Sequence, residues 1–295
     1  MSLISVIIVN YNQEKLTIKS INSILKYWLT VKYEIIVIDN NSLKSSLLKN
    51  FCSKHNIKFI KSKKNYGLAK AFNIGIKNSK GDYILLFNND AFFIEKVYFK
   101  KLFKFINSLE YNKWIIGFKI LNEDLTIQYS IYKYPTLLSF IKRILKYGDE
   151  LIKDDNIYEQ INVFNDKFLK GVVLFFKKEL IKDIGGFDEN IFLYSEETDF
   201  QFRAIKKGYK IIYYPYIKVL HLGSKSTSGS YDKLAFQYVS LLYFFGKHYS
   251  VYSKIVLKFI IIIEIGIKFF YFILKDKEKG RKYIKVLKYI LRNEK

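Results

Sequence analysis

The sequence has few of the residues and motifs that mark several common classes of protein. It contains one cysteine, Cys52, so no disulfide can form within the chain, and this fits a reducing cytoplasm. The first residues lead directly into the apolar run Leu3–Val9. A basic leader, an apolar core of about 7–15 residues and a small-residue cleavage site are missing there, so we expect no secretion signal.

Three catalytic or nucleotide-binding signatures are also missing. The loop after Leu3–Val9 reads Asn10-Tyr11-Asn12, so a nicotinamide dinucleotide site would lack its glycine-rich phosphate turn. No GxxxxGK[ST] sequence occurs, which argues against P-loop nucleotide hydrolysis. The histidines are scattered, without an HExxH motif, and Cys52 on a helix face is more typical of a core residue than of a nucleophile.

Basic residues are in clear excess. The chain has 50 Lys and Arg against 27 Asp and Glu, a formal net charge of +23. Such a balance suggests an anionic partner, either nucleic acid, a membrane surface or a phosphorylated ligand. Lysine is abundant along the whole sequence, however, so part of the excess can equally be a bias of composition. A nucleic-acid-binding protein would gather its basic residues on one aromatic-lined face, and this spread predicts no nucleic-acid partner.

Short apolar runs alternate with helical periodicity in the first third of the chain. The runs at residues 3–9, 35–38, 57–60 and 81–87 predict four buried strands, with helices between them. This alternation predicts an α/β fold with a doubly wound, mostly parallel sheet. Further strands are expected at 115–120, 169–176 and 211–214. Residues 128–164 are less periodic, and we predict an irregular, mobile loop on the acceptor side.

Polar side chains follow several of the predicted strands. The most conspicuous are Asn88, Asn89 and Asp90, directly after the apolar run 81–87. Ligands of open α/β sheets bind beyond the carboxyl ends of the strands, where these residues could hold a hard cation and a phosphate-bearing ligand. An Asx-rich turn would have the same composition.

Other polar positions would lie on the same edge of the sheet, and each has a structural alternative. Asp39 could accept hydrogen bonds from a base or ribose, or cap the next helix. Asn65 and Gly67 suggest a turn close to a ligand, or simple helix packing. Glu196 and Glu197 could be a general base with its orienting neighbour, or could complement a helix dipole. His221 could join Asp90 in a cation site, or be an ordinary loop histidine.

The C-terminal part of the chain has a different composition. Residues 254–275 are intensely apolar, but charged residues interrupt them, and a membrane-spanning helix needs about 20 predominantly apolar residues. At about 100° per residue, the charged side chains fall within an arc of about 120°; they are Lys254, Lys258, Glu264, Lys268 and Lys275. This stripe is typical of a helix lying in the membrane interface, followed by a basic segment suited to anionic headgroups. A helix buried against the preceding domain is the alternative.

Six segments of the sequence form an ordered set of motifs: VNYN (9–12), DNNS (39–42), NYGLAKAFNIGI (65–76), GDYILLFNND (81–90), GGFDENIFLYSEETDFQFRAIKKGY (185–209) and HLGSKS (221–226). Together they resemble the family-2 glycosyltransferases, and most closely their rhamnosyltransferase-like branch. The resemblance covers about residues 3–275. It implies a GT-A fold, a nucleotide-diphosphate sugar donor, a divalent cation (Mg²⁺ or Mn²⁺) and inversion at the anomeric carbon.

The resemblance also implies roles for single residues. The nucleotide-sugar would be bound by positions from four of these segments, namely Tyr11, Asp39, Asn65, Gly67, Asn88 and Asn89. Asp90 would be the metal ligand of a DxD-like site, joined by His221. Glu197 stands where the family has the catalytic Asp of a Glu-Asp pair, so either Glu197 or Glu196 could be the base. The DxD-like site at residues 88–90 has one carboxylate instead of two, so the bound cation would depend more on oxygens of the diphosphate as ligands.

Together these features predict a glycosyltransferase domain at residues 1–230 and a helical, basic and apolar extension at residues 231–295. The expected acceptor is a lipid-linked glycan or a polysaccharide of the cell surface, and the expected location is the cytoplasmic face of the cell membrane. A catalytically inactive membrane-bound scaffold of the same fold is the main alternative. The oligomeric state cannot be predicted from the sequence.

Overall fold

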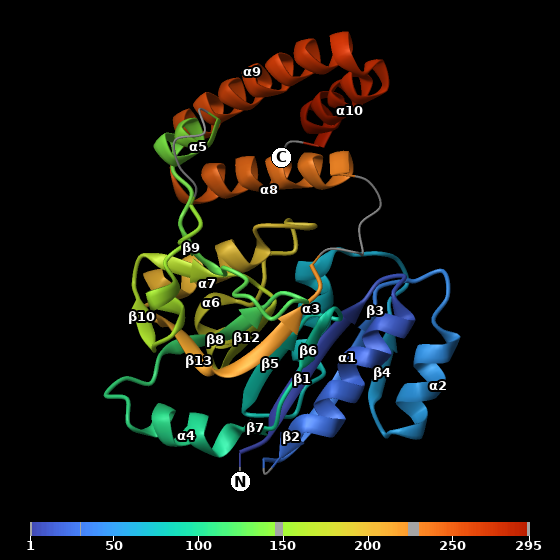
Figure 1. The fold of residues 1–295 in the computed structure, drawn as a ribbon, viewed down its shortest axis with the longest axis vertical. Helices are drawn as coiled ribbons and strands as arrows, with labels where there is room; N and C mark the ends of the chain where they lie inside the picture. The colour runs from blue at the N-terminus through green and yellow to red at the C-terminus, as the bar shows by residue number, and fades with distance from the viewer. Residues whose placement is uncertain (1, 30, 145–149, 224–229, 294–295) are drawn as a thin grey trace. The chain divides into compact units, whose positions relative to one another are not determined.

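The computed structural model describes residues 2–29, 31–144, 150–223 and 230–293 (Figure 1). The chain divides into two compact units. The first comprises Met1–Tyr134, Leu151–Glu189 and Glu197–Ser226, and the second comprises Pro135–Glu150, Asn190–Glu196 and Thr227–Lys295. The second unit therefore includes two short segments from within residues 1–230, in addition to the C-terminal helices.

The first unit is built on four parallel strands with helical connections. Side by side, these strands are β4 (Lys58–Lys61), β3 (Tyr33–Asp39), β1 (Ile4–Asn10) and β5 (Tyr83–Phe87). The connecting helices are α1 (Glu14–Tyr27), α2 (Ser46–Lys54) and α3 (Leu68–Lys77). The central strands are almost wholly buried, as their continuous apolar runs predict.

The rest of the central sheet is mixed. β12 (Val173–Lys177) runs antiparallel between β5 and β8 (Trp114–Leu121), and β13 (Lys210–His221) runs parallel to β8. Two short strands, β6 (Ala91–Phe93) and β10 (Asn162–Phe164), pair antiparallel with β13. Because β12 is antiparallel to both neighbours, β8 and β13 point the same way as β5. The carboxyl ends of β1, β3, β5 and β13 therefore share one edge.

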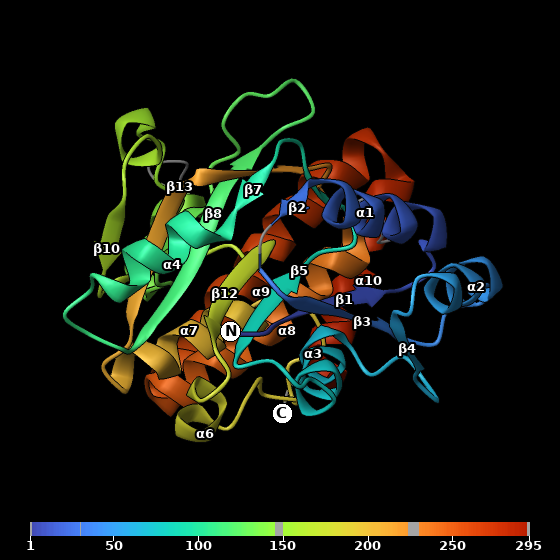
Figure 2. The same ribbon diagram turned by 90° about the horizontal axis from the view of Figure 1, so that it is seen from below.

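Helices cover both faces of this sheet (Figure 2). Side chains of α1, α2 and α4 (Phe99–Asn107) share one apolar core with one face. Side chains of α3, α6 (Leu180–Ile184) and α7 (Glu196–Lys206) share a second core with the other face. This arrangement confirms the α/β fold predicted from the sequence.

The segment predicted to be irregular contains ordered elements. Within residues 128–164, β9 (Ile131–Lys133) pairs with β11 (Lys167–Leu169), and η1 (Asp155–Tyr158) is a 3₁₀ turn. The Tyr158 side chain is fully buried and its hydroxyl accepts hydrogen bonds from two backbone N–H groups. Burial of Tyr158 therefore helps to hold η1 beside β9, a tertiary contact that the weak periodicity of the sequence did not reveal. Another small sheet pairs β2 (Trp28–Leu29) with β7 (Val97–Tyr98).

The second unit consists of helices. They are α5 (Leu137–Ile144), α8 (Ser230–His248), α9 (Val251–Lys275) and α10 (Lys277–Asn293). Glu264 on α9 is buried and forms an ion pair with Lys268, and Lys254 of the same helix packs over Gly246 of α8. Part of the predicted polar stripe thus lies against the unit's own helices. Of the helices described, none combines the length and apolar character needed to cross a membrane.

Candidate functional site

Hydrogen bonds connect the carboxyl ends of three neighbouring strands. After β5, the Asn89 side chain donates to the Thr17 hydroxyl at 3.3 Å, and that hydroxyl lies 2.7 Å from Oδ1 of Asn10, at the end of β1. Asn10 in turn donates to Oδ1 of Asp39, the last residue of β3, at 2.7 Å. Thr17 was not predicted as a site residue, since it lies within the amphipathic pattern of α1.

The predicted nucleoside-binding residues Tyr11 and Asp39 lie at adjacent strand ends and differ in exposure. Tyr11 is exposed, whereas Asp39 is fully buried. The Asp39 carboxylate accepts hydrogen bonds from Asn10 and from the backbone N–H of Ser42, and Lys61 Nζ lies 4.0 Å from it. This carboxylate therefore helps to shape the edge of the sheet as well as being a candidate ligand contact.

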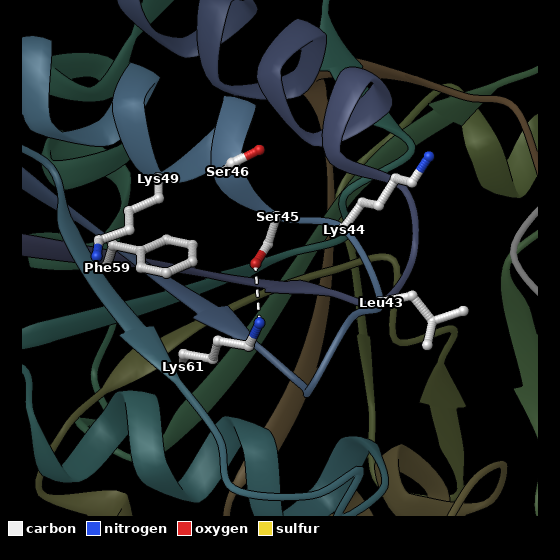
Figure 3. Close-up of a pocket in the computed structure, with 7 residues that line it drawn as sticks. All are labelled: Leu43, Lys44, Ser45, Ser46, Lys49, Phe59 and Lys61. Carbon is white, nitrogen blue, oxygen red and sulfur yellow. Dashed lines mark hydrogen bonds between the residues drawn. The ribbon is translucent and has the colours of Figure 1, made fainter.

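A pocket of about 580 Å³ opens beside Lys61 (Figure 3). Its lining comes from the loop after β3, the start of α2, and β4, and consists of Leu43, Lys44, Ser45, Ser46, Lys49, Phe59 and Lys61. Lys61 Nζ donates to the Ser45 hydroxyl at 3.3 Å and to the Ser42 carbonyl oxygen at 3.4 Å. Lys61 was not predicted as a site residue; its position at the end of β4 is the signal that could have identified it.

The turn that contains Asn65 and Gly67 is tied to the end of β3 by Asn40. The Asn40 amide donates to Oδ1 of Asn65 at 2.8 Å and to the Gly67 carbonyl at 3.1 Å, and accepts from the Tyr66 N–H at 3.0 Å. Gly67 has φ 82° and ψ 177°, a conformation open essentially to glycine alone. Both predicted residues therefore lie at the sheet edge, immediately before α3.

Asp90 and His221 meet at the end of β5 and β13. Backbone hydrogen bonds fold residues 88–91 into a turn, in which the Asn88 carbonyl accepts from the Ala91 N–H at 3.1 Å, and Ala91 pairs with His221. His221 Nε2 lies 3.3 Å from Oδ1 of Asp90, and both side chains are buried. The two predicted metal ligands are thus neighbours, although they are far apart in the sequence.

Two residues that were not predicted from the sequence, Gln128 and Lys170, lie beside His221. Gln128 Oε1 lies 2.6 Å from Nδ1 of His221 and accepts a hydrogen bond from Lys170 Nζ at 3.3 Å. Burial lowers the pKa of Lys170, while the negative charges of Glu197 and Asp90 raise it. Gln128 belongs to the segment predicted to be irregular, and Lys170 looked like one of many lysines. Its position just before Gly171 and a buried strand was the available signal.

The donor atoms of Asp90 and His221 suit a divalent cation in part. A carboxylate oxygen and an imidazole nitrogen are both accepted cation ligands, and Mg²⁺ commonly takes one or two protein ligands plus substrate phosphates. Within residues 2–29, 31–144, 150–223 and 230–293, no three or more His, Cys, Asp or Glu side chains gather into a metal-holding group. A cation at this pair would therefore need oxygens from a diphosphate or from water.

Glu197 lies on the first turn of α7, against Gly171, which lies two residues before the start of β12. A Cβ atom added to Gly171 would lie 3.0 Å from Cβ and 3.2 Å from Cγ of Glu197. Oε2 of Glu197 is buried, and no hydrogen-bond partner for it occurs in the described part of the chain. Burial raises the pKa of Glu197, and backbone hydrogen bonds and the charge of Lys170 act in the opposite direction. A buried carboxyl with a raised pKa suits a general base.

Two further carboxylates, Glu196 and Asp199, lie near the start of α7, and the structure separates Asp199 from Glu197. Glu196 is buried at the first position of the helix. Asp199 is fully buried and accepts a hydrogen bond from Arg203 Nε at 2.8 Å, one turn later. Arg203 also donates to the carbonyl oxygens of Ile184 and Gly186, so this ion pair joins α7 to the turn after α6. Asp199 therefore has a structural role.

Family models and single relatives both relate this chain to the glycosyltransferases. The model of the family described as Glycosyl transferase family 2 matches residues 5–161, and that of Glycosyl transferase family group 2 matches residues 154–257. A hexosyltransferase of low-salt glycan biosynthesis, Agl10 of Haloferax volcanii, is 27% identical over 70% of this chain and 63% of its own length. The dTDP-rhamnosyl transferase RfbF of Shigella flexneri is 26% identical over 75% of this chain and 69% of its own.

Solved structures share the fold at low sequence identity. The mannosyltransferase PcManGT of Pyrobaculum calidifontis, solved with GDP-Man and Mn²⁺, has a TM-score of 0.55 at 16% identity, over 83% of this chain and 63% of its own. GalNAc-T7, solved with UDP, GalNAc and Mn²⁺, has a TM-score of 0.60 at 17% identity, over 82% of this chain and 48% of its own. The first family model covers more than half of the chain, and the chain is therefore a member of glycosyltransferase family 2 with a GT-A type fold.

Proposed function

We propose that this protein is an inverting, cation-dependent glycosyltransferase that uses a nucleotide-diphosphate sugar. The observation that carries the proposal is the position of Lys170 among the predicted catalytic groups. Its ammonium group interacts electrostatically with both Glu197 and Asp90, and Gln128 links it to His221. The proposed base and the proposed cation ligands therefore lie around one basic side chain at one edge of the sheet.

The donor would lie along the carboxyl ends of β1, β3 and β5. Tyr11, Asp39 and Asn65 are proposed to contact the nucleoside, and the edge also carries Gly67, Asn88 and Asn89. Asp90 and His221 would hold Mg²⁺ or Mn²⁺, which when bound would neutralise the departing diphosphate. The structural neighbours solved with GDP-Man and Mn²⁺ and with UDP and Mn²⁺ support this choice of donor and cation.

Glu197 is the proposed general base. Its carboxylate would take the proton of the acceptor hydroxyl as that oxygen forms its bond to the anomeric carbon. The bond between this carbon and the diphosphate breaks in the same displacement, so the configuration inverts and no covalent intermediate forms. Lys170 would add a positive charge near the breaking bond, which matters because the stretch 88–90 supplies a single carboxylate.

The proposed acceptor is a lipid-linked or polysaccharide glycan of the cell surface. The H. volcanii relative acts in glycan biosynthesis and the S. flexneri relative is a dTDP-rhamnosyl transferase, so rhamnose is a candidate for the transferred sugar. The relatives differ in their sugars, and a screen of donors is the direct way to choose among them.

We further propose that the second unit attaches the enzyme to the cytoplasmic face of the membrane. Helix α9 exposes a row of large apolar side chains at intervals of three or four residues, namely Tyr252, Val256, Phe259, Ile263, Ile267, Phe270 and Leu274. Helix α10 buries Tyr283, Val286 and Ile290 and exposes lysines and arginines. An exposed apolar stripe beside basic side chains is what an anionic bilayer surface binds.

A thermal-shift and hydrolysis screen tests the enzyme function. The purified full chain would be combined with UDP-, GDP- and dTDP-sugars, with and without Mn²⁺. We expect one nucleotide class to raise the melting temperature more strongly with Mn²⁺, and slow hydrolysis of the matching sugar donor. Binding without hydrolysis or transfer would instead favour an inactive scaffold, the alternative that the single carboxylate in residues 88–90 keeps open. Absence of binding by any donor would contradict both.

A further inference from the structure

Gln128 lies where β8 continues into a hairpin turn. The backbone N–H of Gln128 donates a hydrogen bond to the Ile120 carbonyl at 2.9 Å, and an antiparallel β-bridge joins Leu121 to Ile127. Leu121 is also paired with Leu220, the residue before His221. The backbone of three neighbouring segments thus sets the Gln128 side chain beside the imidazole of His221.

The orientation of the Gln128 amide follows from its four partners. Nε2 faces two acceptors, Oδ1 of Asn122 at 2.8 Å and the carbonyl oxygen of His221 at 3.2 Å. Oε1 faces Lys170 Nζ at 3.3 Å, and an ammonium group can only donate. Turning the amide over would replace favourable hydrogen bonds with repulsive contacts, so one orientation is strongly preferred.

This orientation decides which ring nitrogen of His221 carries the proton. Nδ1 lies 2.6 Å from Oε1 of Gln128, which is an acceptor, so Nδ1 must donate. In the neutral imidazole Nε2 then has a free lone pair, and it points to within 3.3 Å of Asp90 Oδ1. Two electron-rich atoms at this distance repel each other unless a cation or a proton lies between them, so this pair favours a bound cation.

We propose that Gln128 is a positioning residue, which holds His221 in its Nδ1–H tautomer and so presents Nε2, together with Asp90, to the divalent cation. The inference rests on the proposed function, because it concerns the same cation. Hydrogen-bond partners of metal-binding histidines commonly fix the tautomer and ring orientation in this way, and their loss typically weakens metal affinity about 10–100-fold.

Two variants at this position separate the proposed role from a structural one. Gln128→Leu removes the acceptor for Nδ1, whereas Gln128→Glu keeps an acceptor. Both variants lose the two bonds that the amide donates to Asn122 and to the His221 carbonyl. A merely structural role predicts the same behaviour for both, while the positioning role predicts a difference between them.

The tautomer is measured by two-bond ¹H–¹⁵N correlation spectra of the histidine rings in the metal-free full chain, at a pH high enough for the His221 ring to be neutral. We expect His221 to be protonated at Nδ1 in the unmodified protein and in Gln128→Glu, and to lose this preference in Gln128→Leu. An Nε2–H tautomer in the unmodified protein would overturn the proposal, and this outcome is readable even if neither variant folds.

Mn²⁺ affinity is measured in parallel by electron paramagnetic resonance of the free ion, in the presence of UDP. We expect about 10–100-fold weaker binding in Gln128→Leu and binding within a few-fold of normal in Gln128→Glu. Equal affinities in both, whether normal or weakened, would overturn the proposal. Asp90→Asn is the reference: if it binds Mn²⁺ normally, the cation site itself is wrong, whereas weak binding in Asp90→Asn beside normal binding in Gln128→Leu rejects only the role of Gln128.

Discussion

His221 Nε2 lies 3.3 Å from Asp90 Oδ1, although the two residues are 131 positions apart in the sequence. The sheet makes this possible, because β5 and β13 point in the same direction and β6, directly after Asp90, pairs with the end of β13. Both side chains are buried, so their relative position is set by the packed edge of the sheet.

Replacement of Glu197 by glutamine should remove the general base. We expect Glu197→Gln to lower turnover by about 10²–10⁴-fold, the usual contribution of a general base, with little change in donor affinity. Turnover is measured with the donor found in the screen, and donor affinity by titration calorimetry. Glu196→Gln is the matched control, because Glu196 is the adjacent buried carboxylate. A large loss in Glu196→Gln, with normal turnover in Glu197→Gln, would move the base to Glu196.

The pH dependence of turnover should report the environment of Glu197. Burial raises its pKa, so the base is protonated, and turnover is lost, as pH falls through a value above the ordinary Glu pKa of about 4.3. Lys170 lowers the pKa of Glu197, and its removal in Lys170→Met should move the acidic limb of the kcat profile to higher pH. Lys170→Arg keeps the charge and should leave the limb near its original pH. An unmoved limb in Lys170→Met would show that the two groups are not coupled.

Gly171 should be intolerant of even one added carbon. The Cβ of alanine would lie 3.0 Å from Cβ and 3.2 Å from Cγ of Glu197, closer than ordinary contacts, so Glu197 must shift. Because a misplacement of about 1 Å can cost about 10²-fold in rate, we expect Gly171→Ala to lose turnover while donor affinity is kept. Gly266→Ala is the control, since a Cβ there meets no atom within 4 Å. Normal turnover in Gly171→Ala would mean that the position of Glu197 is not critical.

Gly67→Ala tests the turn that carries Asn65. With φ 82° and ψ 177°, this position should lose about 1–3 kcal/mol of stability when it gains a Cβ, and the turn held by Asn40 should distort. We expect a lower melting temperature together with weaker donor binding. Gly208→Ala is the control, because Gly208 also has a positive φ of 84° but lies after the far end of α7. If both variants lose stability but neither loses donor affinity, the turn does not contact the donor.

Much of the fold was predictable because strands that are buried on both faces consist of continuous apolar residues, which can be recognised in the sequence. Strands β1 and β5 are buried on both faces, so the apolar runs 3–9 and 81–87 located them closely. The direction of β12 could not be recognised in this way, because a buried run reads the same in parallel and antiparallel pairing. The mixed character of the sheet was therefore missed.

At the sheet edge, the candidate site residues were predictable where polar residues follow apolar strands. This rule located Asp39, Asp90 and His221, whereas Gln128 and Lys170 lie outside it and reach the site through tertiary pairing. In the acidic cluster at the start of α7, the sequence singled out Glu196 and Glu197, and the structure gives Asp199 an ion pair with Arg203. A basic residue four positions after Asp199 was the one local sign that this carboxylate belongs to an ion pair.

Charged side chains placed on the exposed row of α9 should release the protein from membranes. Phe259 and Phe270 are 62% and 68% exposed, so glutamates there unpack little of the helical unit but add repulsion and remove apolar area. We expect Phe259→Glu/Phe270→Glu to lose binding to vesicles containing phosphatidylglycerol in flotation, and removal of residues 251–295 to move the protein to the soluble fraction. Val163→Glu/Tyr216→Glu adds the same charge to exposed sites on the first unit and should bind normally. If both double variants bind vesicles as well as the unmodified protein does, α9 is not the attachment surface. If both lose binding to the same extent, the added negative charge alone explains the loss.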